Sequence, residues 1–343
     1  SSGSPALEYG AIEPGRGGAI PQPCAKLLEP LQNTLVAFEA LGGSMANRRD
    51  FLRNSATIAS ALALPVGWPR TLMAQQKLPR RAIHGTDDSL PVIGLGNSNA
   101  FRRNDVPVST ALIKLFFESG GAYIDCSGDS RFVVADVAGS LGIGSDLFLG
   151  TYFSNDDESA SGKSIKRILA ATGKKQLDLM HSYPEFAEPN WELFRKWKED
   201  GLTRYIGVAR HAQSYYNTMM KMMADGTVDF LQVNYSPLET MADRQVLPMA
   251  LDKGVTVTIN RPFINGNYFS HVRGHDLPAW AAEFDCESWA QFSLKFILSH
   301  PAVTCVLTET ANPKHALDNI GAGFGRLPDE KTRQRMVQYL RDL

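Results

Sequence analysis

Several polar and titratable side chains of this sequence stand at the ends of short apolar runs. Asp125 and Tyr152 end or follow two such runs, and Tyr183 and Arg210 come shortly after two others. If the runs are neighbouring parallel strands, their carboxyl ends meet at one edge and bring these side chains together. A positioned phenol can transfer a proton to a reacting oxygen, which typically contributes ~10²–10⁴ to a rate. This chemistry would use Tyr152 or Tyr183, hydrogen-bonded near Asp125.

Other interpretations of the same residues stay open. The two tyrosines could fill a pocket that has no catalytic use, and the sequence favours this because nothing cationic is expected directly beside either phenol to lower its pKa. Asp125 could orient a catalytic partner or only cap a strand-end loop. Arg210 could supply a positive charge beside one of the phenols, or it could bind an acidic ligand directly.

The histidines and cysteines do not indicate a metal site. His181 and His211 could join Asp125 or Asp129 around an ion, but no HxH or HxxxH spacing supports this. The cysteines form no CxxC pair and are expected to be buried thiols rather than a disulfide framework. They are Cys24, Cys126, Cys286 and Cys305.

The length and composition allow one large domain. The chain has 343 residues, of which 43% are hydrophobic and 21% are charged. A single α/β barrel of about 250 residues would use most of it. The formal net charge of −1 gives no reason to expect nucleic acid or anionic lipid as a partner.

Residues 191–208 contain a helix followed by a strand. Leu193, Phe194 and Trp197 share one face at helical spacing. Gly201 ends this helix, and residues 205–208 form a short apolar run of the kind that a buried parallel strand uses. The same helix-to-strand step is repeated along the chain.

The repeated step predicts a (β/α)8 TIM barrel. Eight strands are expected, at residues 92–95, 122–126, 147–151, 177–181, 205–208, 230–234, 256–260 and 303–307. Helical runs between them include residues 110–118, 164–171, 213–224 and 289–298. In such a barrel the chemistry lies on the loops that follow the strands. The alternative is an open doubly wound sheet, but Gly94 and Gly96 lack the third glycine of a phosphate-binding turn.

The first 76 residues are expected to lie outside the barrel. Residues 1–44 are rich in Gly, Pro and Ala, so they are interpreted as an artificial or upstream translated leader without stable structure. Residues 45–76 resemble a twin-arginine signal peptide, because Arg48 and Arg49 precede an apolar run at 58–66 and a small residue, Ala74. The run is too short to span a bilayer.

This N-terminal pattern predicts the location of the protein. Cleavage near Ala74 would leave a periplasmic protein without stable membrane insertion, which meets the export machinery only transiently. The barrel would then occupy residues 77–343.

From residue 80 to residue 336 the chain resembles the aldo-keto reductases, especially their bacterial branch that is exported by the twin-arginine pathway. The resemblance rests on residues 90–96, 120–125, 197–201, 204–207, 229–236, 260–263, 312–313 and 319. It implies a barrel that reduces carbonyl groups with NADPH. In that family a tyrosine donates the proton, a lysine lowers its pKa, an aspartate holds the lysine and a histidine orients the carbonyl.

The catalytic positions of the family are only partly kept. Asp125 matches the aspartate, whereas Ser130 stands in place of the tyrosine. Tyr152 stands in place of the lysine, and Tyr183 in place of the histidine. These four residues are therefore the candidate catalytic residues of a modified site.

The cofactor side of the resemblance is altered as well. Its expected contacts are Gln232, Arg210, Arg261, Thr310, Asn312, Lys314 and Asn319. The last four are expected at the start of the last helix, where backbone N–H groups favour an anion. Glu309, however, occupies a position that the family usually fills with a small residue, and a carboxylate beside a phosphate repels it by ~1 kcal/mol or more. Binding of NADPH is therefore expected to be weakened or lost.

Two function hypotheses follow. The first is an NAD(P)H-dependent oxidoreductase that acts on a small carbonyl compound through the modified site. The second is a periplasmic barrel that has lost hydride transfer and binds a small polar ligand with Tyr152, Tyr183, Arg210 and Arg261.

Overall fold

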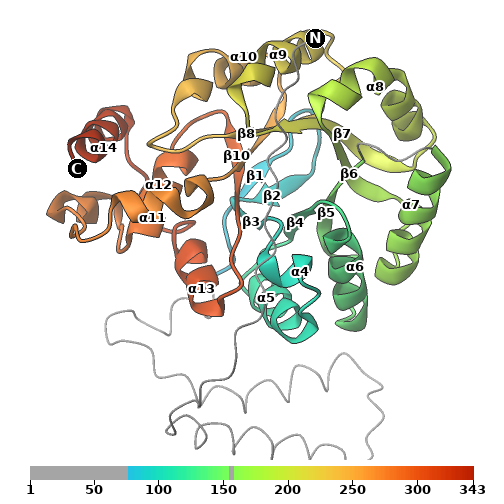
Figure 1. Cartoon of the computed structure of the whole chain (residues 1–343), viewed down its shortest axis with the longest axis horizontal. Helices are drawn as coiled ribbons and strands as arrows, with labels where there is room; N and C mark the ends of the chain where they lie inside the picture. Colours follow the sequence, from blue (N-terminus) through green and yellow to red (C-terminus); the bar gives the residue numbers. More distant parts are fainter. Residues whose placement is uncertain (1–75, 154–157) are drawn as a thin grey trace, which may run out of the picture. The chain divides into compact units, whose positions relative to one another are not determined.

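The computed structural model describes residues 76–153 and 158–343. The expected leader (1–44) and nearly all of the expected export signal (45–76) lie outside the described residues. Eight parallel strands close into a barrel (Figure 1). They are β3 (Ile93–Leu95), β4 (Tyr123–Cys126), β5 (Phe148–Tyr152), β6 (Leu177–Ser182), β7 (Thr203–Arg210), β8 (Phe230–Asn234), β9 (Thr256–Asn260) and β10 (Val303–Thr308).

The predicted (β/α)8 barrel is confirmed. Every expected strand overlaps an observed one, and their order around the barrel is β10-β3-β4-β5-β6-β7-β8-β9. The alternative of an open sheet is wrong, because Val306 of β10 pairs with Ile93 of β3 and closes the ring. All eight strand ends therefore face one mouth.

The step from α8 to β7 shows how the sequence builds one repeat. α8 (Pro184–Glu199) begins at a proline, whose missing N–H costs no hydrogen bond at the first helical position. Phe194 and Trp197 are buried on its inner face. Gly201 then adopts a φ of 72°, a left-handed conformation that stops the helix, and β7 begins at Thr203.

The other helices surround the barrel. They are α4 (Asn99–Arg102), α5 (Val106–Glu118), α6 (Ser130–Ser140), α7 (Glu158–Thr172), α9 (Tyr216–Ala224), α10 (Val246–Asp252), α11 (Asn267–His271), α12 (Trp289–Leu298), α13 (Pro313–Gly321) and α14 (Glu330–Asp342). The expected run at 289–298 coincides with α12, whereas the run at 213–224 is a 3₁₀ turn (Gln213–Tyr215) followed by α9.

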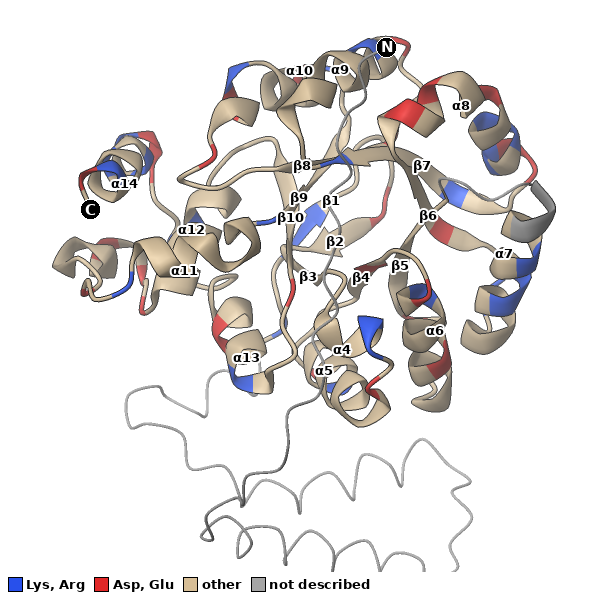
Figure 2. Ribbon diagram, in the orientation of Figure 1, with Lys and Arg blue, Asp and Glu red and all other residues tan. Residues whose placement is uncertain are grey.

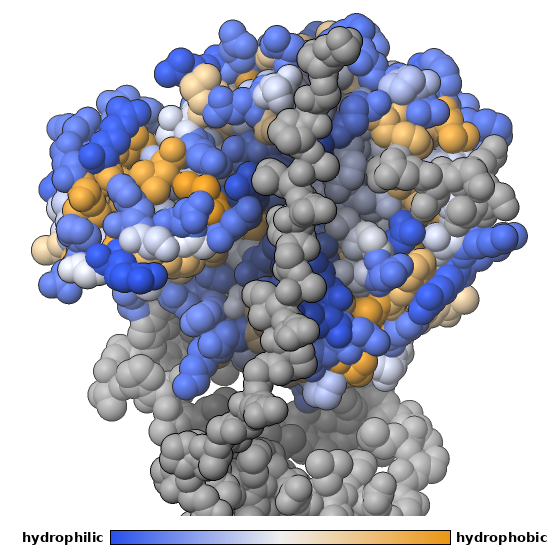
Figure 3. All heavy atoms as spheres, viewed as in Figure 1, coloured by the Kyte–Doolittle hydropathy of each residue, from blue (hydrophilic) through white to orange (hydrophobic). Residues whose placement is uncertain are grey.

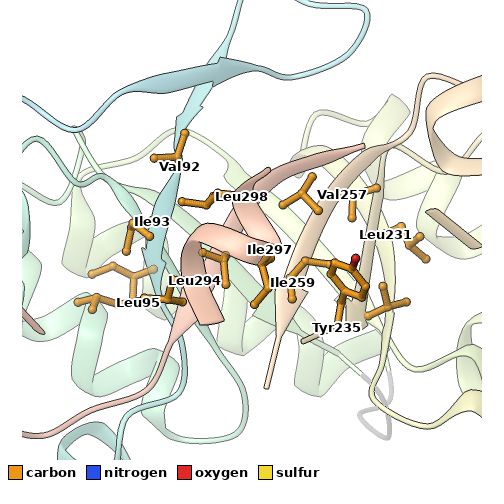
Figure 4. Close-up of a cluster of buried hydrophobic side chains, with 14 of the residues drawn as sticks. Val92, Ile93, Leu95, Leu231, Tyr235, Val257, Ile259, Leu294, Ile297 and Leu298 are labelled. Carbon is orange, nitrogen blue, oxygen red and sulfur yellow. The ribbon is translucent and has the colours of Figure 1, made fainter. Parts of the chain in front are cut away.

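The main hydrophobic core lies between the strands and this ring of helices. Figure 4 shows a part of it in which α12 contributes Leu294, Ile297 and Leu298, near strand residues that include Ile93, Leu231, Val257 and Ile259. Removal of this apolar surface from water is the main force that holds the strand ends in register. Cys126, Cys286 and Cys305 are buried free thiols, as expected, and Cys24 lies outside the described residues.

A two-stranded hairpin closes the amino end of the barrel. β1 (Arg80–Ala82) pairs antiparallel with β2 (Ser89–Pro91). Ile83 and Leu90 of the hairpin belong to the same buried cluster as Tyr123 and Phe148, the first residues of β4 and β5. Strands of three residues are too short to show a period, so the sequence did not predict the hairpin. Because the hairpin closes the amino end, the carboxyl end is the open one.

Charged residues lie mainly on the helices and loops (Figure 2). The surface that Figure 3 shows is largely hydrophilic, and one of its hydrophobic areas lies over α11, α12 and α14. No helix among the described residues is long and apolar enough to cross a bilayer.

Candidate active site

A cavity of about 140 Å³ opens at the carboxyl end of the strands, and we call it the mouth cavity. Six of the candidate catalytic and cofactor-binding residues line it: Asp125, Tyr152, Tyr183, Arg210, Gln232 and Arg261. They come from separate repeats of the chain, and the closed barrel brings them to one place. Such a mouth is where barrel proteins carry their sites.

Asp125, Tyr152 and Gln232 form one hydrogen-bonded group across the mouth. Asp125 Oδ2 accepts hydrogen bonds from Gln232 Nε2 at 2.7 Å and from the Tyr152 hydroxyl at 3.1 Å. The Tyr152 hydroxyl also lies 2.6 Å from Gln232 Oε1, to which Asn260 Nδ2 donates at 3.2 Å. Gln232, expected as a cofactor contact, thus orders the carboxylate and the phenol.

Asp125 is a buried carboxyl group, only 4% exposed. Burial raises its pKa to about 6, although the hydrogen bonds from Gln232 and Tyr152 act in the opposite direction. Its second oxygen, Oδ1, has no hydrogen-bond partner among the described residues. Gly150 makes room for this oxygen, because a Cβ at that position would lie 2.1 Å from it. Burial of a carboxylate with one unpaired oxygen lowers the stability of the fold, so its presence here points to a functional role.

His181 lies beside the same carboxylate, inside the barrel. Its Nε2 is 3.8 Å from Asp125 Oδ1 and 3.5 Å from the Tyr123 hydroxyl, and its ring stacks on Tyr152 with centroids 5.1 Å apart. Burial lowers the His181 pKa to about 3, so the imidazole is neutral at physiological pH and forms no ion pair with Asp125. Within the ranges that the structure describes, no three His, Cys, Asp or Glu side chains are grouped to hold a metal ion.

The two phenols have different electrostatic surroundings. Burial raises the pKa of Tyr152 well above its ordinary value, and Asp125 raises it further. Burial also raises the pKa of Tyr183, but Arg210 opposes this. The Arg210 guanidinium carbon lies 4.8 Å from the centroid of the Tyr183 ring and 4.7 Å from that of Tyr215. The sequence left open which tyrosine Arg210 accompanies, and in the structure Arg210 lies beside Tyr183.

A second cavity, of about 490 Å³, shares three lining residues with the mouth cavity: Arg102, Arg261 and Glu309. Arg102 Nη1 lies 3.4 Å from Glu309 Oε2, so this ion pair stands at the boundary between the two cavities. Phe263 and Phe269 line the second cavity with ring centroids 4.8 Å apart. The mouth thus continues into a larger space with both charged and aromatic walls.

The turn after β9, which borders both cavities, has a strained backbone. Arg261, Ile264 and Asn265 have φ values of 51°, 51° and 54°, in the left-handed region that disfavours residues with a side chain. The Arg261 side chain is anchored there by a hydrogen bond from Nε to Asn265 Oδ1 at 3.2 Å. Strain of this kind clusters at binding sites, where the surrounding fold holds it in place.

The structure does not bring every expected residue to these cavities. Ser130 is buried in the first turn of α6 and lines neither cavity. Thr310 lines the second cavity. The side chain of Asn312 accepts the Lys314 N–H and so caps α13, Lys314 is exposed and Asn319 is buried in the helix. These three residues of the α13 region line neither described cavity.

The lining residues that were missed as site residues include Asn97, Arg102 and Asn260. A signal existed for the two asparagines, because Asn97 follows β3 and Asn260 ends β9. Arg102 belongs to α4, a helix of four residues that is too short to show a period.

The fold and the site define the class of protein: a (β/α)8 barrel whose polar cavity lies at the carboxyl end of the strands. Comparison with protein families refines it, because residues 92–335 match the model described as the aldo/keto reductase family. The chain therefore belongs to the aldo-keto reductase family. No curated protein sequence matches it.

Solved structures of aldo-keto reductases have the same fold. The holo form of a Bacillus halodurans aldo-keto reductase is 17% identical, with a TM-score of 0.60 and coverage of 77% of this chain and 96% of that one. An aldo-keto reductase of Klebsiella pneumoniae, in complex with NADP and acetate, is 18% identical with a TM-score of 0.59, and the match covers 75% and 94% of the two chains. One from a Medee basin deep-sea metagenome library is 16% identical, with a TM-score of 0.60 and coverage of 76% and 94%.

Proposed function

We propose that this protein is an NADPH-dependent oxidoreductase that interconverts a small carbonyl compound and its alcohol with altered acid–base residues. Family membership supports the reaction class. The observation that carries the proposal is the Tyr152 hydroxyl, which lines the mouth cavity and is held by Asp125 and Gln232. By resemblance, Ser130, Tyr152 and Tyr183 stand at the family's tyrosine, lysine and histidine positions, so we infer that Tyr152 transfers the proton in place of the family's tyrosine.

We infer that a dinucleotide would bind in the second cavity. Arg102 offers positive charge for a phosphate, Asn265 and Thr310 offer polar side chains, and Phe263 and Phe269 offer ring faces. The related Klebsiella pneumoniae protein was crystallised with NADP. NADPH bound in this cavity would supply the hydride.

The protein's own residues would handle the proton. Tyr152 donates its hydroxyl proton to the substrate oxygen as negative charge develops there. Asp125 Oδ2, 3.1 Å from that hydroxyl, returns a proton to the phenol oxygen when the carboxyl group is protonated, which its pKa of about 6 allows in mildly acidic solution. The neutral ring of His181 and the amide of Gln232 keep both groups in position. Turnover should therefore increase as the pH falls through about 6.

A second candidate function is ligand binding without hydride transfer. The Arg102–Glu309 ion pair at the boundary of the two cavities favours ligand binding over hydride transfer. A cofactor that extends through both cavities would have to bind alongside this ion pair or displace it. The raised pKa of Tyr152 favours ligand binding as well, because a phenol of high pKa is a weaker acid. In this case the mouth cavity would hold a small polar ligand near Tyr183, Arg210 and Arg261.

A fluorescence titration of the purified full chain with NADPH decides between the two functions. Micromolar binding, followed by turnover of small aldehydes or ketones, supports the oxidoreductase. Absence of binding up to millimolar NADPH rejects it. If binding is present, Tyr152→Phe should lower turnover by ~10²–10⁴ while the Kd of NADPH stays within about threefold of wild type. Equal turnover of this variant would exclude Tyr152 as the proton donor.

We also propose that the protein is exported to the periplasm. The support is Arg48-Arg49 followed by an apolar run, in the part of the chain outside the described residues. Assignment to the exported branch of the family rests on the same residues.

A further inference from the structure

Three arginines line the mouth cavity, and they differ in how their charge is used. Arg102 faces Glu309 at 3.4 Å, and Arg210 faces Glu185 at 2.6 Å. Arg261 has no carboxylate within 4.0 Å among the described residues, and its only hydrogen bond there is the one from Nε to Asn265. Its two terminal nitrogens are therefore available to a ligand. A guanidinium with free terminal nitrogens suits a carboxylate, which it can bind through two parallel hydrogen bonds.

The hydrogen bonds of the neighbouring residue specify a second ligand group. Ionised Asp125 can only accept, so Gln232 must turn its NH₂ group toward it, at 2.7 Å. Gln232 Oε1 then faces Asn260, which must present its own NH₂ group, at 3.2 Å. This leaves Asn260 Oδ1 as a buried acceptor without a partner among the described residues. An unpaired buried acceptor is costly, and a ligand hydroxyl would satisfy it.

A second acceptor of the same kind lies in the same cavity. Asn97 Nδ2 donates to Ser127 Oγ at 2.9 Å, and Asn97 Oδ1 is buried without a partner within the described ranges. Both asparagines line the mouth cavity. The cavity wall therefore suits a ligand that donates hydrogen bonds to the two asparagine oxygens and carries a negative charge for Arg261.

The negative charges of the cavity do not cancel this preference. Glu309 is paired with Arg102, and Asp125 Oδ2 accepts hydrogen bonds that offset part of its charge. Asp125 Oδ1 has no hydrogen-bond partner among the described residues, so the anionic group must bind at Arg261 and away from Asp125. The size limits the ligand, because the cavity of about 140 Å³ is close to an engineered cavity of about 150 Å³ that holds benzene. About six non-hydrogen atoms therefore fit.

We propose that the mouth cavity binds a short 2-hydroxycarboxylate, with its carboxylate on Arg261 and its hydroxyl donating to Asn260 Oδ1. Asn260 and Arg261 both line this one small cavity, so a ligand of about six non-hydrogen atoms that reaches both must carry its two polar groups close together. The inference rests on the proposed function in one respect: it names the substrate class of that same site. The 2-oxo acid binds less well than the hydroxy acid, because a carbonyl oxygen cannot donate to Asn260 Oδ1 and repels it.

Calorimetric or ligand-observed NMR titrations of the cofactor-free full chain test this with a matched ligand series. The probes are lactate (both enantiomers) and glycerate, with propionate to remove the hydroxyl, pyruvate to replace it by a carbonyl, and lactamide to remove the charge. We expect lactate or glycerate to bind at least about tenfold more tightly than each of the three control ligands. Equal binding of lactamide, or tighter binding of pyruvate or propionate, overturns the inference.

Variants locate the binding. Arg261→Gln should weaken binding of the hydroxy acid by about tenfold or more, whereas Arg273→Gln, the same charge change at an exposed site that lines neither cavity, should leave it unchanged. Asn260→Ala should make lactate and propionate bind equally. Wild-type affinity in both Arg261→Gln and Asn260→Ala overturns the assignment, and circular dichroism confirms that each variant is folded. If a variant does not fold, the ligand series with the wild-type chain still tests the inference.

The experiments distinguish failure of the hydroxycarboxylate site from failure of the proposed oxidoreductase function. If NADPH binds and a neutral aldehyde is reduced while no acid binds up to about 50 mM, the hydroxycarboxylate site is rejected and the oxidoreductase stands. If the acids bind as expected and NADPH does not, the site stands and hydride transfer is rejected. If Arg261→Gln weakens NADPH binding but not acid binding, Arg261 is a phosphate ligand and the inference is wrong.

Discussion

The carboxyl group of Asp125 should make the whole protein less stable at neutral pH than in mild acid. Its pKa is raised from 3.8 to about 6 by burial, so the folded protein binds this proton more tightly than the unfolded chain does. The stability that this group contributes is fully present below about pH 4 and is lost as the pH rises through about 6. The difference between the two pKa values corresponds to about 3 kcal/mol above pH 6.

Asp125→Asn removes this cost without removing the hydrogen bonds. An asparagine oxygen can accept from Gln232 and Tyr152 as the carboxylate oxygen Oδ2 does, and its NH₂ group would replace Oδ1, which has no hydrogen-bond partner among the described residues. The variant should therefore be more stable than wild type at pH 8, by up to about 3 kcal/mol, and the two proteins should converge near pH 4.

Urea unfolding of both proteins between pH 4 and pH 8, followed by tryptophan fluorescence, measures the difference. Asp129→Asn, a change at an exposed carboxylate on the same loop, is the control and should shift stability by less than about 0.5 kcal/mol. A variant that is less stable than wild type at pH 8, or a stability difference that does not change with pH, would refute the reasoning.

Three further changes test other parts of the site and the N-terminal signal. Gly150→Ala places a Cβ 2.1 Å from Asp125 Oδ1 and should destabilise the protein by about 3 kcal/mol in urea unfolding, but by much less in an Asp125→Ala background; equal costs in both would contradict the proposed clash. Glu309→Gly should tighten NADPH binding about three- to tenfold at low salt and less at high salt, in fluorescence titrations; unchanged or weaker binding would argue against repulsion of a phosphate. Lysine at both Arg48 and Arg49 should keep the protein in the bacterial cytoplasm, as measured by cell fractionation, and periplasmic accumulation of this variant would count against twin-arginine export.

The barrel could be predicted from the sequence because its signals are local and repeated. Each strand is a short apolar run, and helices such as α12 have apolar residues at helical spacing. The hairpin β1–β2 and the short helix α4 could not be predicted, because segments of three or four residues have no measurable period.

The sequence alone determined which residue types stand at the strand ends. It placed Asp125, Tyr152 and Tyr183 there, and by resemblance it predicted that the family's lysine and histidine are replaced. It also placed Ser130 among them, and the structure buries that residue in the first turn of α6, outside both cavities. The reason is that a position counted along the chain does not say on which side of a helix the side chain lies.

Only the tertiary structure decided how these residues interact. The Asp125 carboxyl pKa of about 6, the neutral His181 ring and the position of Arg210 beside Tyr183 rather than Tyr152 all depend on burial and on contacts between distant repeats. The same holds for Arg261, which has no carboxylate partner among the described residues, and for the oxygen of Asn260, which is unpaired within the same ranges. Desolvation and hydrogen bonding are set by neighbours that the closed barrel brings together, and the linear sequence does not contain those distances.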